Sequence, residues 1–82
     1  MDEKTHISRK GKNYVVSTVL IGGDLNIASA YMSLGGPYET MVFACDANGL
    51  VTSYQELYFD RYKTEAAARA GHAKAIAEFN PK

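Results

Sequence analysis

The chain has 82 residues with nine basic and nine acidic side chains, so its formal net charge is zero. A chain of this length forms one domain, and a hydrophobic share of 46% excludes intrinsic disorder over most of it. A single cysteine excludes an intrachain disulfide, and no apolar run reaches the length of a membrane-spanning helix, so we expect a cytoplasmic protein without membrane contact.

Residues 1–12 are polar and carry charges of both signs. They lack the apolar run of a secretion signal, and we interpret them as a flexible leader before a single domain over residues 13–80. Residues 13–60 contain no Lys or Arg. Because a nucleic-acid-binding surface concentrates basic side chains, we do not expect nucleic acid among the partners. The one segment that could bind nucleic acid is the basic arm of Arg9, Lys10 and Lys12.

Residues 13–21 (NYVVSTVLI) are rich in β-branched side chains and predict the first strand. Both alternating faces of this segment are largely apolar, which indicates a central strand or a strand covered on both sides. Gly22 and Gly23 end the strand, and residues 24–38 then form a connection that is long for so small a domain.

The connection over residues 24–34 favours a short helix. Asp24 can cap its N-terminus, because a carboxylate accepts hydrogen bonds from the free backbone N–H groups of a first helical turn. Gly35 and Gly36 can end the helix, with Pro37 just beyond them. A mobile lid is the alternative for the same residues.

Two further strands are predicted over residues 38–45 (YETMVFAC) and 50–59 (LVTSYQELYF). The intervening Asp46-Ala47-Asn48-Gly49 is typical of a tight turn, because Asp starts turns and Asn-Gly accepts positive φ. The two strands should therefore pair as a hairpin, with Tyr54 and Tyr58 on one face of the third strand.

A C-terminal helix is predicted to begin after Thr64, which can cap it, and to run to about Phe79. The segment is rich in alanine and therefore forms a helix readily. One stripe of this helix should face the sheet: Ala68, His72, Ala75, Ile76 and Phe79. The sequence thus predicts an α+β fold of β-β-β-α order, a small antiparallel three-stranded sheet with one helix packed on one face.

Catalytic and metal sites have little support in the sequence. His72 should face the sheet, and Glu39 could meet it from a converging strand face as an acid–base pair. The simpler interpretation is a core histidine that fixes the helix against the sheet. Cys45 fits a small buried side chain better than a nucleophile, and no pair of residues has the spacing of a zinc site. We expect no cofactor, and a binding protein rather than an enzyme.

A different set of residues is typical of a small-ligand site. Glycine-rich segments can offer backbone N–H groups to an anion, and Arg61 is the only cation beside the predicted sheet. The alternative function is therefore the binding, with or without hydrolysis, of a small anionic ligand or nucleotide. Its site would comprise Asp24, Gly35, Gly36, Glu39, Arg61 and His72.

Six tyrosines are many for a chain of this length. Tyrosine is enriched at protein interfaces, because its ring is apolar while its hydroxyl can stay in water. One helix cannot cover a tyrosine-rich sheet on both faces, so we expect a homo-oligomer, most simply a homodimer. The expected interface residues are Tyr31, Tyr38, Tyr54 and Tyr58.

Several short strings follow one another in a recognisable order: Val16-Ser17-Thr18-Val19, Gly23-Asp24, Gly35-Gly36-Pro37, Glu39-Thr40-Met41-Val42-Phe43, Arg61-Tyr62-x-Thr64 and Gly71-His72. Over about residues 15–76 the pattern resembles a group of short, uncharacterised proteins of bacteriophages and prophages, notably those of actinobacteria. This chain departs from the group by longer segments at residues 24–34 and 48–58. The resemblance implies an accessory role in the host cytoplasm, with a host or phage protein as a partner, but no specific activity.

Overall fold

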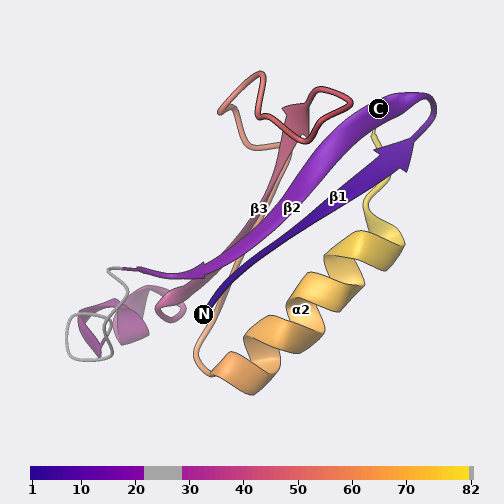
Figure 1. The fold of residues 1–82 in the computed structure, drawn as a ribbon. Helices are drawn as coiled ribbons and strands as arrows, with labels where there is room; N and C mark the ends of the chain where they lie inside the picture. Colours follow the sequence, from indigo (N-terminus) through magenta and orange to yellow (C-terminus); the bar gives the residue numbers. More distant parts are fainter. Residues whose placement is uncertain (22–28, 82) are drawn as a thin grey trace.

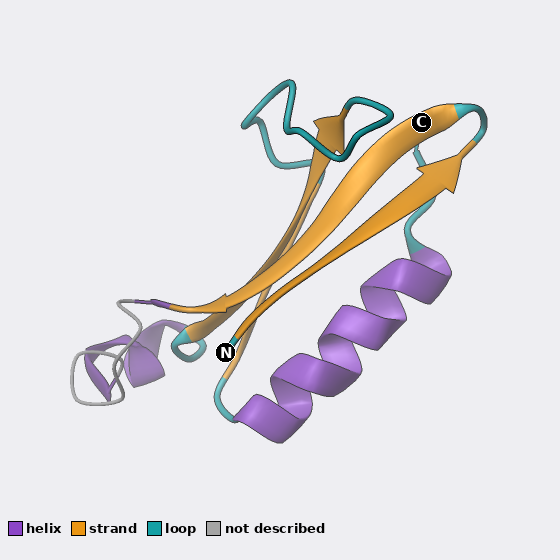
Figure 2. Cartoon of the chain, in the orientation of Figure 1, coloured by secondary structure: helices purple, strands orange, loops and turns teal. Residues whose placement is uncertain are grey.

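A computed structural model describes residues 1–21 and 29–81. In chain order its elements are β1 (Asp2–Arg9), β2 (Lys12–Leu20), η2 (Ser29–Leu34), β3 (Tyr38–Cys45), β4 (Tyr58–Tyr62) and α2 (Glu65–Glu78). Within these residues, four strands form one antiparallel sheet in the order β1-β2-β3-β4, and α2 lies along one face of it (Figure 1; Figure 2). The predicted α+β class with a C-terminal helix is confirmed, whereas the prediction of three strands is wrong.

The additional strand is β1, which lies in the segment interpreted above as a flexible leader. Lys10 and Gly11 form a two-residue turn with positive φ values of 53° and 75°, as a type I′ hairpin requires. The turn pairs β1 with β2 along its whole length, and Thr5 lies opposite Val16. The interpretation of residues 1–12 as a flexible leader is therefore wrong. The segment looked like a leader because β1 is an edge strand, with polar outward side chains and one buried residue, Ile7.

The predicted turn after β3 is confirmed. The carboxylate of Asp46 accepts hydrogen bonds from the backbone N–H groups of Asn48 and Leu50, at 2.8 and 3.0 Å. Gly49 has a φ of 85°, a conformation that glycine adopts without the steric penalty of a side chain. These contacts reverse the chain at the end of β3.

The third strand predicted over residues 50–59 has the wrong bounds. At its start, Val51 forms an isolated bridge with Cys45. The chain then leaves the sheet and resumes pairing at Tyr58, which lies opposite Val42. The physical reason is a mismatch in length, because the stretch between the two pairing positions is longer than the opposite stretch of β3 and must loop out.

The ends of α2 agree with the prediction. The hydroxyl of Thr64 accepts a hydrogen bond from the N–H of Ala67 at 3.1 Å, which satisfies one of the free donors of the first turn. At the other end, the N–H of Phe79 donates to the carbonyl of Ala75 at 2.9 Å. The helix buries small or polar residues against the sheet: Ala68, Gly71, His72 and Ala75.

Gly71 lies at a close approach of α2 to β4. A Cβ atom at this position would lie 2.1 Å from Cζ of Tyr62. Real Cβ atoms do not approach another atom so closely, so the Tyr62 ring can lie against the helix only because residue 71 is glycine.

The hydrophobic core lies between α2 and the sheet. Val16 of β2 and Val42 of β3 pair across the central strands and are fully buried. Near the end of the helix the rings of Tyr14 and Phe79 meet edge to face, with centroids 5.0 Å apart. The prediction of residues 13–21 as a central strand is therefore confirmed for β2.

The connection before β3 is helical in its described part. The 3-10 helix η2 covers Ser29–Leu34, so the expected short helix is present there, while Asp24, its proposed cap, lies outside the described residues. Gly35 and Gly36 follow with φ values of 104° and 114°, and the N–H of Gly36 donates to the carbonyl of Tyr31. The glycines thus end the helix as predicted.

The two faces of the sheet differ. The face against α2, here called the helix face, carries the core. Because side chains alternate along a strand, the other face, here called the open face, carries the remaining residues of β1 to β4. On β1 these include Asp2, Lys4 and His6, and on the other strands Val19, Glu39, Met41, Phe43, Phe59 and Arg61.

Candidate functional site

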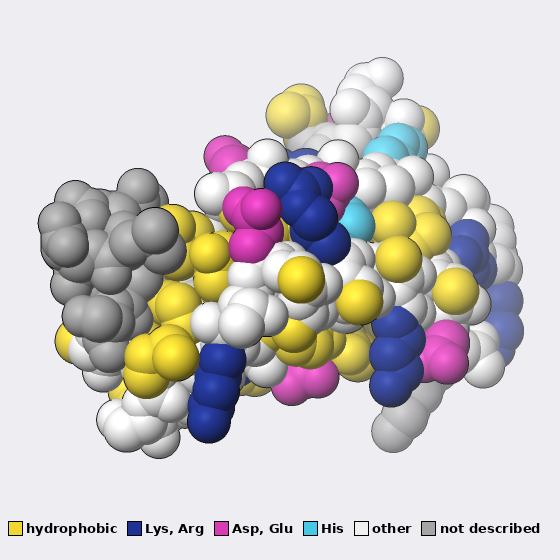
Figure 3. Space-filling model, turned by 90° about the horizontal axis from the view of Figure 1, so that it is seen from below, with side chains coloured by type: hydrophobic (Ala, Val, Ile, Leu, Met, Phe, Trp, Pro, Cys, Tyr) yellow, Lys and Arg dark blue, Asp and Glu magenta, His cyan; other side chains and the backbone are white. Residues whose placement is uncertain are grey.

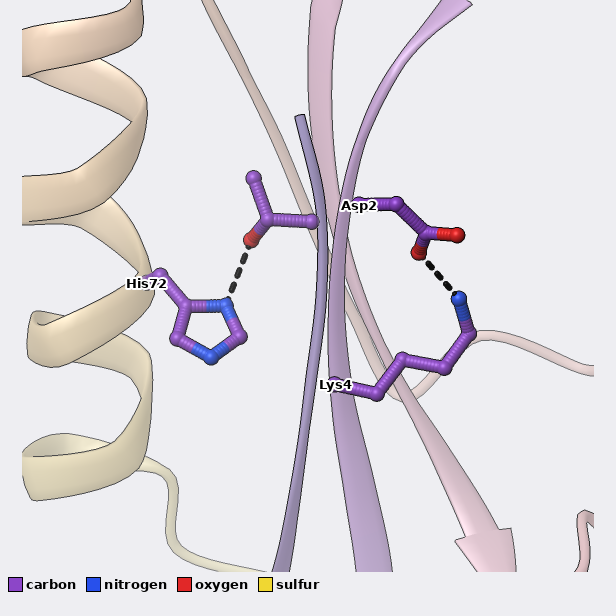
Figure 4. A network of polar contacts seen from close by, with 4 residues as sticks. Asp2, Lys4 and His72 are labelled. Atoms are coloured by element: carbon purple, nitrogen blue, oxygen red, sulfur yellow. Dashed lines mark hydrogen bonds and ion pairs between the residues drawn. The ribbon is translucent and has the colours of Figure 1, made fainter.

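On the helix face, His72 lies at the centre of a buried polar cluster. Its side chain is 3% exposed, and its Nδ1 and Nε2 atoms lie 2.7 and 2.9 Å from the hydroxyls of Thr18 and Thr5. The Thr18 hydroxyl is in turn 2.6 Å from that of Thr40. Figure 4 shows the imidazole reaching from α2 toward a hydroxyl of the sheet, while Asp2 and Lys4 point away from the helix on the other side.

This cluster satisfies the imidazole without a charged partner. Hydroxyls can donate or accept, so a neutral ring can donate from one nitrogen and accept at the other. Among the described residues no buried side-chain nitrogen or oxygen lacks a partner. Burial lowers the pKa of His72 below its ordinary value, which keeps the ring neutral. The geometry matches the simpler interpretation made from the sequence, a histidine that fixes the helix against the sheet.

The acid–base pair of Glu39 and His72 is not present, because Glu39 lies on the open face. Its Oε2 atom is 3.1 Å from a guanidinium nitrogen of Arg61, its partner across β3 and β4. The Arg61 guanidinium carbon also lies 5.8 and 5.4 Å from the ring centroids of Tyr31 and Phe59. Arg61 is therefore held by one carboxylate and two aromatic rings.

The six residues proposed as one ligand site divide between the two faces. Arg61 and Glu39 lie together with the Gly35-Gly36 turn, and an Arg61 nitrogen is 3.4 Å from the Gly36 carbonyl. His72 lies on the other side of the sheet, and Asp24 is outside the described residues. An anionic ligand at Arg61 would have to displace the carboxylate of Glu39, so the geometry does not favour the anion-binding alternative.

Gly36 has a structural role of its own in this turn. A Cβ atom there would lie 2.1 Å from the backbone oxygen of Tyr62, so the two backbones lie in close contact. Residue 36 must be glycine because of this close contact and because of its positive φ. Both reasons are structural and involve no bound anion.

The four tyrosines proposed for an interface also divide. Tyr38 is buried, and Tyr58 packs against the core on the helix face. Tyr54 is 78% exposed and covers Phe43 on the open face, with ring centroids 5.6 Å apart. Tyr31 lies beneath Arg61 on the same side. Only Tyr31 and Tyr54 are therefore placed where they could contact a partner across the open face.

Apolar side chains gather on the β3–β4 half of the open face. Met41 and Phe59 are directly opposite each other, and Phe59 remains 44% exposed. With Phe43 and Tyr54 they form a surface here called the apolar patch: Met41, Phe43, Tyr54 and Phe59. No helix of the described residues lies over this side of the β3–β4 half of the sheet (Figure 1). The β1 half of the open face is polar.

Both edges of the sheet are poorly suited to pair with another strand. On β4 the carboxylate of Asp60 accepts a hydrogen bond from the backbone N–H of Arg61 at 2.8 Å, which occupies a donor at that edge. On β1 the edge carries the charged side chains of Asp2 and Lys4, which bond to each other. Charged side chains and occupied backbone donors are common protections of exposed sheet edges.

The basic residues near the β1–β2 turn contact the end of the helix. Arg9 donates to the carbonyl of Ile76, and Lys10 donates to that of Pro81 at 3.2 Å. Cations are favourable at a helix C-terminus, where backbone carbonyls lack partners. On the side seen in Figure 3, Lys and Arg side chains are interspersed with Asp and Glu, unlike the continuous basic surface of a nucleic-acid binder.

Comparison of the chain with protein-family models, with curated proteins and with solved structures gave no match. Within the described residues, no helix is long and apolar enough to cross a membrane. The same residues contain no group of three His, Cys, Asp or Glu side chains arranged to hold a metal ion.

Proposed function

We propose that this chain is a small interaction protein that forms a homodimer through the open face of its sheet. The observation that carries the proposal is the apolar patch, which includes an aromatic ring, Phe59, that is 44% exposed on a regular strand. Contiguous apolar surface on a small protein marks a contact with another molecule, because leaving it in water is unfavourable.

The size of the molecule supports a contact of this kind. Its principal dimensions are 40 × 21 × 17 Å, so its broad face is comparable with the roughly 800 Å² that each partner buries in a standard protein interface. A chain of 82 residues also buries a smaller fraction of its surface than a larger domain does. A second copy on the open face would add the apolar burial that a single copy lacks.

Charge on the open face supports a second copy as the occupant. The two ion pairs there, Glu39 with Arg61 and Asp2 with Lys4, each sum to zero. Two identical faces can therefore approach without net repulsion, and a two-fold axis would bring the apolar patches together. A face of one sign would instead have favoured a partner of opposite charge.

The biological setting belongs to the same proposal. The resemblance to short phage and prophage proteins supports an accessory role in a host cytoplasm, with a host or phage protein as a partner of the dimer. The open face is the surface on which we expect a heterologous partner to compete with the second copy.

Size-exclusion chromatography with light scattering tests the dimer. We expect twice the chain mass of 9.0 kDa for the wild type and the single chain mass for Phe59→Ser. Leu57→Ser is the matched control, because Leu57 is 48% exposed but lies beside Phe79 on the helix side. A monomeric wild type, or a dimer that Leu57→Ser disrupts and Phe59→Ser does not, would contradict the proposal.

A further inference from the structure

A second surface lies at the end of the sheet near the β1–β2 turn. A groove of about 750 Å³ is bounded there by β2, the end of β3, the residues before β4 and the chain after α2. Its apolar lining includes Tyr14, Leu57 and Phe79, and its volume is within the range of small-molecule sites. A shallower hollow adjoins it and shares Leu57 and Phe79.

Charge is distributed unevenly around this groove. Lys12 lines it, and Lys10, which binds the carbonyl of the lining residue Pro81, lies beside it. Within residues 1–21 and 29–81, neither lysine nor Arg9 is in ion-pair contact with a carboxylate. Glu56 is the one acidic residue of the lining. The rim near the turn thus carries cations that form no ion pair with the described carboxylates.

We propose that the groove binds a small amphipathic anion, a compound with an apolar body and a single carboxylate. The body lies on Tyr14, Leu57 and Phe79, and the carboxylate pairs with the ammonium group of Lys12. Glu56 also lines the groove and disfavours a second anionic group, so the site selects monoanions. The proposal is independent of the dimer, since Phe59 is not part of the groove lining.

An NMR titration of the ¹⁵N-labelled chain with octanoate tests this site. We expect saturable shifts at the backbone amides of Tyr14, Leu57 and Phe79, and much weaker binding of octanol, which has the same body without the charge. Lys12→Gln should weaken octanoate binding about tenfold or more, because it removes the charge-assisted contact. Binding of octanol should not change in this variant.

Two controls separate this site from the others. Lys63→Gln removes an exposed lysine after β4, at the opposite end of the sheet, and should leave octanoate binding unchanged. Phe59→Ser should also leave it unchanged, whatever its effect on the oligomer. The proposal is overturned if octanoate gives no saturable shifts in the groove, if Lys12→Gln binds it as the wild type does, or if Phe59→Ser abolishes its binding. Shifts confined to residues 9–12 with a DNA duplex, and absent with octanoate, would instead indicate a polyanion surface.

Discussion

His72 is a polar side chain placed where the helix and the sheet meet. A buried imidazole is costly unless both nitrogens have partners, and the hydroxyls of Thr5 and Thr18 supply them. Because these partners carry no charge to offset the loss of water, burial favours the neutral ring over the imidazolium. Burial accordingly lowers its pKa, and the charge of Glu3 opposes this effect more weakly.

The titration of His72 predicts a pH-dependent stability. The ring has a lower pKa in the folded chain than its ordinary value of 6.5, so below that pH the unfolded chain binds the proton more readily. The free energy of unfolding should therefore fall as the pH is lowered from about 7.5 to about 5.5. Urea denaturation at both pH values measures the change.

Two histidine variants serve as controls for this prediction. His72→Gln keeps hydrogen-bonding groups but does not titrate, so it should be less stable at neutral pH by about 1–3 kcal/mol and should lose the pH dependence. His6→Gln alters an exposed histidine and should keep the dependence. A pH dependence that survives in His72→Gln would assign it to other groups.

At the scale of elements, small residues determine how closely α2 approaches the sheet. The helix faces the sheet with Ala68, Gly71 and Ala75, and Gly71 lies where the Tyr62 ring of β4 rests against it. Gly36 lies against the backbone of Tyr62 and Lys63. The end of β4 is therefore held by two glycines, and a side chain at either would displace it.

Gly71→Ala tests this packing. In an ordinary helix the change stabilises by about 1 kcal/mol, because alanine has the higher helix propensity. Here the new Cβ would meet the Tyr62 ring, so we expect a loss of about 1–3 kcal/mol from overpacking. In a Tyr62→Ala background, where the ring is absent, Gly71→Ala should instead raise the free energy of unfolding, as denaturation of the double variant can measure. A stabilising effect in the wild-type background would show that the ring moves away freely.

At the scale of the whole molecule, α2 covers one face of the sheet, and no helix of the described residues covers the apolar patch on the other. The proposed dimer predicts that thermal unfolding depends on protein concentration, since dissociation accompanies unfolding. We expect the Tm of the wild type to rise over about a hundredfold range of concentration, and that of Phe59→Ser to stay constant. Differential scanning calorimetry measures both. A wild-type Tm that does not change with concentration would contradict the dimer.

The candidate sites show what the alternation of side chains along one strand can predict. Alternation correctly places Glu39 on one strand face, but which face the helix covers depends on packing between distant segments. The predicted pair of Glu39 and His72 required the helix to cover the face on which Glu39 lies. The helix covers the other face, and Glu39 pairs with Arg61 instead. The groove could not be anticipated at all, because its lining comes from four separate stretches of the chain.

Local signals in the sequence by themselves determined β2, β3, the turn at Asp46 and the helix after Thr64, because apolar periodicity, turn residues and caps act within a few neighbours. Only the tertiary structure decided the place of β1 and the bounds of β4. β1 is a strand because β2 offers it a partner and the helix buries Ile7, and β4 begins at Tyr58 because pairing with β3 outweighs the local pattern. Strand pairing joins residues far apart in the chain, so its register is set by packing and not by local preference.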